Sequence, residues 1–373
     1  MKIGIDARFY RSSTGGIGRY TRALLKNLAK LDKKNKYVIF LTPLDMKEYD
    51  IKAENFSEVV APISHYSFAE QTKFLKILNE AKLDLVHFTN FNHPVFYKRK
   101  FIVTVHDLTL MLYPQSKNKY SWLKKSGFRL VMQNAVKAAK CVISDSDATK
   151  KDLIKYLSAN AEKIKTIYLG IDDEYRRVAK TSLDTLEKKY KIKTPYLLFI
   201  SQWRPHKGIG ELVEAFETLK TKYNIAHKLV IVGKSNPNFP SIAQTIQSSK
   251  WAKDIIVTGF VDDSDLPAIY KHADLFVFPS HYEGFGLPPL EAMAGGTPVA
   301  ASNVSCIPEI LGAGAMYFDP YKPAEMAKKI YDVITQKNLK DDLIKKGLEI
   351  SQKYHWQKTA SETLKLYEKA NTQ

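Results

Sequence analysis

The chain has 373 residues, of which 45% are hydrophobic and 26% charged, and this composition argues against an intrinsically disordered protein. Its length exceeds one comfortable hydrophobic core, so we expect about two domains. No apolar run is long enough to span a membrane, and Met1 leads almost directly into a strand-like segment, which leaves no room for a signal peptide. We therefore expect a cytoplasmic protein whose two cysteines, Cys141 and Cys306, are buried free thiols.

The formal net charge of +18 is concentrated in the first half of the chain. Residues 1–190 contain 35 Lys and Arg against 20 Asp and Glu, whereas the remainder contains 22 against 19. Residues 91–140 alone contain ten basic residues and one acidic residue, Asp107. Such a surface suits an anionic membrane, a phosphate-bearing acceptor or nucleic acid, although a general lysine excess explains it equally well.

The first half alternates apolar strands with helical stretches, which predicts a parallel sheet covered on both faces. It opens with a strand, a glycine turn at Gly15–Gly18 and a helix over Arg19–Lys30. The expected strands are Ile3–Ala7, Tyr37–Leu41, Leu85–Phe88, Phe101–Val105, Cys141–Ser144 and Thr166–Leu169, and the expected helices between them include Ala69–Ala81, Tyr120–Ala139 and Ala148–Leu157.

The same pattern restarts after a charged stretch, about Asp172–Lys193, which we expect to connect two domains of residues 1–180 and 194–352. Ligands of such doubly wound sheets bind outside the carboxyl ends of the strands, so we expect the site in the cleft between the domains. The expected strands are Tyr196–Ile200, Lys228–Val232, Ile255–Thr258, Asp274–Phe278 and Pro298–Ser302, and the expected helices are Gly208–Tyr223, Pro323–Thr335, Leu339–Gln352 and an amphipathic Trp356–Lys369.

The stretch His281–Pro298, HYEGFGLPPLEAMAGGTP, is the strongest candidate for chemistry. It follows the strand Asp274–Phe278 and opens through glycines onto a helix start, where backbone N–H groups and the helix dipole favour an anion. Glu283 and Glu291 flank this anion site and are suited to hold hydroxyls. The combination indicates a phosphorylated sugar compound.

Cations suited to a diphosphate follow another strand, in the segment SQWRPHKG. Arg204 and Lys207 are three positions apart and are followed directly by a helix, whose N-terminus would face the same anion. His106 closes the strand Phe101–Val105 and is placed to bind a substrate or to shuttle a proton, unless it is a structural histidine. His281 is equally ambiguous.

Three further patterns carry weaker signals. The turn Gly15–Gly18 is only loosely like a dinucleotide fingerprint, because no acidic residue ends the second strand. The clusters Asp145-Ser146-Asp147 and Asp262-Asp263-Ser264-Asp265 are candidate metal sites, but each precedes a helix and is better explained by turn and capping chemistry, with Asp147 as the cap. We therefore expect no metal and no other cofactor.

The chain resembles the retaining GT-B glycosyltransferases of family 4 over essentially its whole length. The resemblance implies two Rossmann-like domains facing across a cleft, the first binding the acceptor and carrying the C-terminal helix 356–373, and the second binding a nucleotide-sugar donor. The similar segments are GIDAR…GGIGRY at the start, TVHD at 104–107, VISDSDATKKDL…IKTIYLGID at 142–172, SQWRPHKGIGELVEAF, and the segment from GFVDDSDL to GGTPVAAS.

The resemblance also assigns a role to single residues. Arg204 and Lys207 would bind the donor diphosphate together with the backbone of Gly16, and Glu291 would bind the ribose hydroxyls. The base would lie near Gly233 and near Phe260-Val261. The transferred sugar and donor oxygens would be bound by Glu283, by the N–H groups of Gly284, Phe285, Gly286 and Leu287, and, near the anomeric carbon, by His106.

Retention without an obvious nucleophile implies a same-face displacement in which the donor phosphate deprotonates the incoming hydroxyl. The resemblance is closest to bacterial mannosyltransferases of polysaccharide and O-antigen assembly, so GDP-mannose is the first expected donor, with UDP-glucose and UDP-N-acetylglucosamine open. The expected acceptor is a glycan or lipid-linked glycan, reached by peripheral docking of residues 91–140 on an anionic membrane; no aromatic-basic pattern supports nucleic acid. The alternatives are a sugar-nucleotide epimerase or hydrolase and a non-catalytic sugar-nucleotide-binding subunit.

Overall fold

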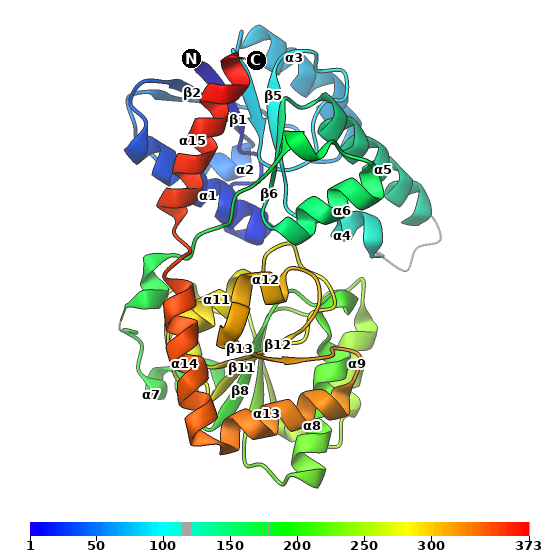
Figure 1. Ribbon diagram of the computed structural model, residues 1–373, viewed down its shortest axis with the longest axis vertical. Helices are drawn as coiled ribbons and strands as arrows, with labels where there is room; N and C mark the ends of the chain where they lie inside the picture. The colour runs from blue at the N-terminus through cyan, green and yellow to red at the C-terminus, as the bar shows by residue number, and fades with distance from the viewer. Residues whose placement is uncertain (114–120, 178, 373) are drawn as a thin grey trace. The chain divides into compact units, whose positions relative to one another are not determined.

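The protein is described by a computed structural model that covers residues 1–113, 121–177 and 179–372, and it divides into two compact units. Within the described residues, unit 1 comprises 1–113, 121–170 and 355–372, and unit 2 comprises 171–177 and 179–354. Both units are coloured by residue number in Figure 1. No helix among the described residues is both long and apolar enough to cross a bilayer.

Unit 1 is built on a parallel sheet of seven described strands in the order β3-β2-β1-β4-β5-β6-β7. The edge strand β3 was not predicted, because most of its residues are exposed and it lacks a continuous apolar run. The strand expected at Thr166–Leu169 is wrong in its bounds, since β7 begins at Ile164 and ends at Thr166. The strands are β1 Lys2–Asp6, β2 Lys36–Leu41, β3 Phe56–Val60, β4 Leu85–Phe88, β5 Phe101–Val105, β6 Cys141–Ser144 and β7 Ile164–Thr166.

The helices of unit 1 cover this sheet, and they differ from the expected ones mainly at their ends. The first helix begins at Gly16 rather than Arg19, and Tyr120 lies outside the described residues. The stretch predicted as one helix over Ala69–Ala81 begins with a π-helical turn. The helices are α1 Gly16–Leu31, α2 Pro43–Met46, η2 Glu70–Phe74, α3 Leu75–Glu80, α4 Thr109–Leu112, α5 Ser121–Ala138, α6 Asp147–Leu157 and α15 Trp356–Thr372, with 3-10 turns η1 Ser12–Thr14 and η3 Ala161–Lys163.

The C-terminal helix α15 packs on the N-terminal helix α1, as Figure 1 shows for the red and dark-blue helices. Tyr367 of α15 is buried, and its hydroxyl lies 2.7 Å from Nδ1 of His87 on β4. His87 in turn contacts the hydroxyl of Thr104 through Nε2 at 2.8 Å. Burial lowers the pKa of His87 to about 3, so this histidine is neutral and part of the core of unit 1.

Unit 2 contains a parallel sheet of six described strands in the order β10-β9-β8-β11-β12-β13. Leu197 and Phe199 of β8 and Leu275 of β11 are buried in a core that α8 and α13 cover. The edge strand β13 was not predicted. The strands are β8 Tyr196–Ile200, β9 Lys228–Val232, β10 Ile255–Gly259, β11 Leu275–Phe278, β12 Val299–Ser302 and β13 Ala315–Phe318.

The stretch expected to connect the domains, Asp172–Lys193, contains a 3-10 turn and an α-helix that belong to unit 2. The helices of unit 2 are η4 Asp173–Arg176, α7 Leu183–Tyr190, η5 Pro205–Lys207, α8 Ile209–Lys222, α9 Pro240–Ser248, η6 Ala252–Asp254, α10 Leu266–Lys271, α11 Leu287–Ala294, α12 Ile307–Leu311, η7 Gly312–Gly314, α13 Pro323–Thr335 and α14 Lys337–Ser351.

Two predictions about polar side chains need correction. Asp147 does not cap α6; Ser146 does, since its hydroxyl accepts the N–H of Thr149 at 3.1 Å. Asp265 precedes α10, but its carboxylate makes no cap and instead accepts hydrogen bonds from three side chains near α7, Thr181, Lys189 and Tyr190.

Both cysteines are free, but only Cys306 is fully buried; Cys141 is half-buried at the start of β6.

Each sheet has a point where the chain reverses the direction in which it adds strands. In unit 1 this point lies between β1 and β4, and in unit 2 between β8 and β11. The loops that follow two such strands leave in opposite directions, and ligands of doubly wound sheets bind in the crevice that this leaves. The fold therefore marks the loops after β8 and β11, and those after β1 and β4, as the places to look for a site.

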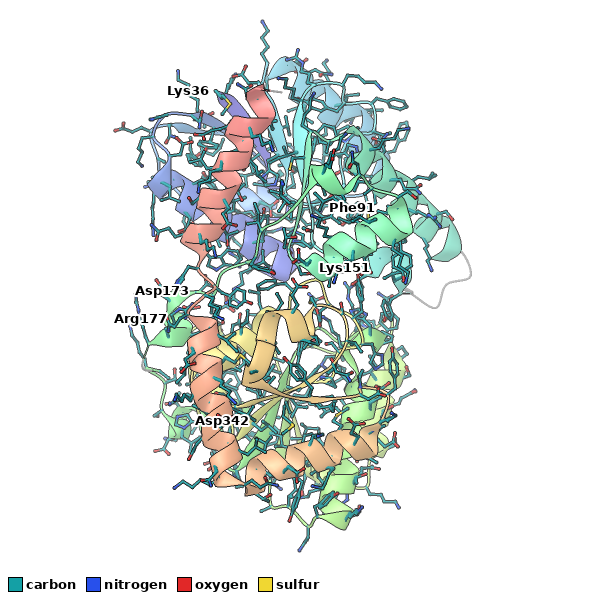
Figure 2. All side chains as sticks on the ribbon, viewed as in Figure 1. Lys36, Phe91, Lys151, Asp173, Arg177 and Asp342 are labelled. Carbon is teal, nitrogen blue, oxygen red and sulfur yellow. The ribbon has the colours of Figure 1, made fainter. Side chains whose placement is uncertain are left out.

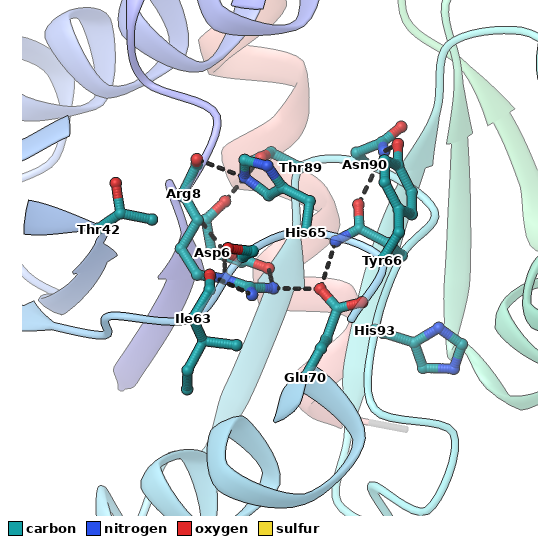
Figure 3. Close-up of polar contacts among 12 residues, drawn as sticks. Asp6, Arg8, Thr42, Ile63, His65, Tyr66, Glu70, Thr89, Asn90 and His93 are labelled. Carbon is teal, nitrogen blue, oxygen red and sulfur yellow. Dashed lines mark hydrogen bonds and ion pairs between the residues drawn. The ribbon is translucent and has the colours of Figure 1, made fainter. Parts of the chain in front are cut away.

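A buried ionic network fills the switch point of unit 1 (Figure 3). Arg8 is fully buried, and its guanidinium donates to Asp6 at 2.7 Å and to Glu70 at 2.6 Å. The same Glu70 oxygen accepts from Asn92 at 2.6 Å, and Asn90 donates both to Asn92 and to the hydroxyl of Tyr66. One charged cluster thus fixes the loops after β1, β3 and β4 in a single arrangement.

Replacing Arg8 with Met should strongly destabilise the protein, because Asp6 and Glu70 would face each other in the core without a cation. We expect a loss of about 3–5 kcal/mol in the free energy of unfolding, measured by chemical denaturation. The matched control is Lys26→Met, which removes the exposed pair with Asp50 and should cost less than about 1 kcal/mol. Equal costs for the two variants would contradict the importance of the network.

Candidate active site

The site in unit 2 is formed by the two loops at its switch point. The first loop runs from β8 through the 3-10 turn η5 to Gly208, and the second from β11 to Gly286. Both glycines have left-handed φ values, 70° and 90°, and each stands at the N-cap of a helix, α8 or α11, without a side-chain cap. Two uncapped helix N-termini therefore begin beside neighbouring strands, and both favour negative charge.

The two loops are in direct contact. A Cβ atom added at Gly208 would lie 2.2 Å from the carbonyl oxygen of Pro279, so no other residue fits there. The N–H of His281 donates to the carbonyl of His206 at 2.8 Å. His206 is buried, and burial together with the cations of Lys207 and Arg204 lowers its pKa to about 3. The His206 side chain is therefore neutral, and its backbone carbonyl joins the two loops.

Lys207 and Glu283 form an ion pair across the two loops, with 2.6 Å between Nζ and Oε1. Their side chains are 17% and 12% exposed, so the pair is accessible but largely screened from water. Both residues were predicted for the site from the sequence, as binders of diphosphate and of sugar, and the structure brings them together. Arg204, half-buried, stands at the start of η5, three residues before Lys207.

Glu283 is held by residues that were not predicted. Ser305 donates from its hydroxyl to the carbonyl of Glu283 at 2.6 Å and accepts the N–H of the same residue at 3.4 Å. The thiol of Cys306 also contacts that carbonyl, at 3.2 Å. Ser305 has a left-handed φ of 57°, a backbone conformation that residues other than glycine rarely adopt and that is often found at functional sites. No sequence motif signalled this contact, because it joins segments 22 residues apart.

The segment Gly284, Phe285, Gly286 and Leu287 is buried and ends at the first residue of α11. Two prolines follow in the first turn of this helix and have no N–H to donate, so the donors at its N-terminus come from the segment itself. The sequence indicates a helix that starts at Glu291, but α11 starts at Leu287, so Glu291 lies one turn into the helix. It is buried, and its carboxylate accepts the hydroxyl of Tyr270 at 2.8 Å.

The region proposed for the base lies at the neighbouring strands β9 and β10. Gly233 and Gly259 pair in an antiparallel bridge, and Phe260 is 64% exposed. The Nζ atom of Lys234 lies 5.5 Å from the centre of the Phe260 ring. An exposed aromatic ring beside a cation offers a planar surface for stacking.

In unit 1, the predicted residues Gly16 and His106 lie at the carboxyl edge of the sheet. Gly16 is the first residue of α1, which begins after Gly15 with φ 67° and has no side-chain cap. His106 follows β5, and its Nδ1 lies 2.6 Å from the Asp145 carboxylate. Its Nε2 lies 2.9 Å from the carbonyl oxygen of Thr89.

Asp145 was set aside as part of a turn, and the structure corrects that reading, because the residue is a buried partner of His106. No group of three His, Cys, Asp or Glu side chains that could hold a metal ion occurs in the part of the chain that the structure describes.

Comparison with known proteins agrees with the two-unit architecture. Residues 14–175 match the family Glycosyltransferase Family 4, and residues 184–349 match Glycosyl transferases group 1. The chain belongs to the family 4 glycosyltransferases. It is 27% identical to the O-antigen chain mannosyltransferase B of Escherichia coli over 98% of this chain and 99% of that protein.

Solved structures show the same fold. Sucrose-phosphate synthase from Thermosynechococcus elongatus superposes with a TM-score of 0.79 at 20% identity, covering 99% of this chain and 98% of that chain. HepE from Anabaena in complex with UDP and glucose gives a TM-score of 0.76 at 18% identity, covering 99% and 100%. The glycosyltransferase therefore has the GT-B fold that the resemblance implied.

Gly208→Ala should weaken both the fold and the site, because the added Cβ meets backbone that cannot yield. We expect a loss of about 1–3 kcal/mol in stability and weaker binding of nucleoside diphosphates, measured by thermal unfolding and calorimetry. Gly210→Ala is the matched control, since nothing lies within 4 Å of its added Cβ and alanine favours a helix. If both variants bound nucleotide like the wild type, the close approach of the two loops would be irrelevant to binding.

Proposed function

We propose that this glycosyltransferase transfers a hexose, with mannose from GDP-mannose as the first candidate, to a glycan or lipid-linked glycan with retention of configuration. The observation that carries the proposal is the Lys207–Glu283 pair at the switch point of unit 2. A cation and a carboxylate side by side match the two halves of a nucleotide sugar, a diphosphate and a polyhydroxyl ring. The full-length similarity to an O-antigen mannosyltransferase supports mannose.

In this proposal the donor binds to unit 2. Lys207 and Arg204 neutralise the diphosphate, the N–H groups of the second loop bind donor oxygens, and Glu283 accepts hydrogen bonds from sugar hydroxyls. Glu291 binds the ribose, and Phe260 lies near the base. The family resemblance assigns acceptor binding to unit 1, and it assigns Gly16 and His106 of that unit to the donor.

The transfer step needs no protein nucleophile. The bond between the anomeric carbon and the diphosphate oxygen breaks, and the acceptor oxygen forms its bond on the same face of the sugar. The acceptor proton passes to the departing phosphate oxygen, and the negative charge that develops there is stabilised by Lys207 and Arg204. No metal ion is required, because the two cations neutralise the leaving group.

Lys207→Ala should abolish most transfer without unfolding the protein, because the leaving diphosphate loses a cation. We expect a fall in kcat of about 100-fold or more, measured with the donor that raises the melting temperature most in a screen of nucleotide sugars. A Lys207→Ala variant as active as the wild type would refute the assignment of Lys207.

Two further assays test the reaction type. Wild-type activity should survive a chelator, and free epimerised or hydrolysed sugar formed without an acceptor would favour an epimerase or hydrolase.

We also propose that unit 1 docks on an anionic membrane that carries the acceptor. Most of the basic residues of 91–140 in the described part are exposed, and Phe96 and Leu130 beside them are each 67% exposed. Lys117 and Lys119 lie outside the described residues. Leu130 follows Phe128 on α5, and Phe128 packs against Tyr66 and against Phe91, which is labelled in Figure 2. Exposed apolar side chains among cations are typical of a surface that enters an anionic interface.

The docking can be measured by flotation with vesicles of neutral lipid, with and without anionic lipid. The wild type should float only with anionic lipid and less at high salt. The double variant Lys125→Glu with Arg129→Glu should lose binding, whereas Lys253→Glu with Lys345→Glu, the same charge change on exposed residues of unit 2, should not. Binding that ignores lipid charge, or equal losses for both double variants, would rule out this surface.

A further inference from the structure

His106 and Asp145 form a buried pair in unit 1. The proposed function gives a role to His106 but none to Asp145. The pair results from strand register, because β5 and β6 run parallel with Val105 opposite Ser144. The next residues on the two strands are His106 and Asp145, so their side chains emerge together at the carboxyl edge. Asp145 is 2% exposed, and among the described residues its second oxygen, Oδ1, has no hydrogen-bond partner.

The contacts of the His106 ring restrict where its protons lie. Nε2 faces the carbonyl oxygen of Thr89, which only accepts, so Nε2 carries a proton. Nδ1 lies 2.6 Å from the Asp145 carboxylate, so one more proton must lie between these two atoms. Two states satisfy both contacts: an imidazolium beside a carboxylate, or a neutral histidine beside a protonated Asp145.

Basicity decides between the two states. An imidazole is more basic than a carboxylate by roughly 2–3 pKa units, which places the shared proton on His106. Burial lowers the pKa of His106, but the charge of Asp145 and the hydrogen bond to it raise the pKa above its ordinary value. Burial raises the pKa of Asp145, whereas the charge of His106 and the hydrogen bond to it lower that pKa, so the pairing opposes burial for both partners.

We infer that Asp145 is a positioning residue that holds His106 as an imidazolium, so that His106 acts in the transfer reaction as a cation and hydrogen-bond donor and not as a base. A sugar hydroxyl would compete with the Thr89 carbonyl for the Nε2 proton. The kinetic part of this inference rests on the proposed role of His106 toward the sugar. The protonation state does not, because it belongs to the protein without donor.

Neither Tyr20 nor His87, which lie close to His106, changes its charge around neutral pH. Tyr20 of α1 packs its ring edge-on at 4.9 Å, and burial raises its pKa far above neutral. His87 of β4 is neutral at any physiological pH. Asp107, the next residue in the chain, is the other acid that raises the pKa of His106. A change in the charge of His106 around neutral pH is therefore governed mainly by Asp145.

The direct test is the ¹⁵N spectrum of histidine-labelled, donor-free protein, with His106→Gln used to assign the signal. Both ring nitrogens of His106 should resonate as protonated nitrogens at neutral pH in the wild type. In Asp145→Asn, Nδ1 should lose its proton, because the uncharged amide can donate to a bare Nδ1 and no longer stabilises an imidazolium. A neutral imidazole in the wild type would overturn the inference. The wild-type spectrum alone shows whether His106 is an imidazolium, even if the variant does not fold or the donor is not GDP-mannose.

Kinetics give a second, independent readout. Because the pKa of His106 is raised, its charged form is present below that pKa and is lost as the pH rises through it. Asp145→Asn should therefore move the alkaline limb of the kcat profile to lower pH and reduce kcat by about 10- to 100-fold, with donor KM changed less than about threefold. The control Asp147→Asn, whose carboxylate contacts Thr166 instead, should leave both unchanged. An unshifted profile in Asp145→Asn would contradict the positioning role.

Discussion

The Lys207–Glu283 ion pair is the interaction on which the site in unit 2 depends. It joins the loops that follow the two strands at the switch point, and three features keep it in place: the close approach of Gly208 to Pro279, the hydrogen bond from His281 to His206, and the contacts of Ser305 with the backbone of Glu283. In this structure each charge is the other's partner. A diphosphate that takes Lys207 would leave Glu283 able to accept sugar hydroxyls.

Pairing of this kind has an energetic consequence. A half-buried charge without a partner is costly, and so an unoccupied site with separated charges would be unstable. The ion pair lowers that cost, and in the proposed function the donor would replace the Lys207–Glu283 contact with two new ones. On the same proposal, a ligand that supplies only a phosphate or only a sugar would replace one contact and leave the other charge uncompensated, which would favour the intact nucleotide sugar.

Much of this arrangement was predictable from the sequence, for an identifiable reason. Arg204, Lys207, Glu283 and the glycines of the second loop directly follow strongly apolar strands, and the ends of such strands are where doubly wound sheets place ligands. The edge strand β3 is mostly exposed and lacked that apolar signal, whereas β13 is apolar but only four residues long. Asp145 was predictable in principle, because it follows β6 as His106 follows β5, but its place before a helix favoured a capping role. The contacts of Ser305, Tyr270 and Glu70 depend on tertiary packing and leave no periodic trace.

The central claim is that Lys207 binds the diphosphate and Glu283 binds the sugar, and calorimetry with GDP and GDP-mannose tests it most directly. Lys207→Met should weaken both ligands by a similar factor, because both contain the diphosphate. Glu283→Gln should weaken GDP-mannose and leave GDP unchanged or tighter, because the lysine is released from its partner. If Glu283→Gln weakened GDP and GDP-mannose equally, the division of roles between the two residues would be wrong.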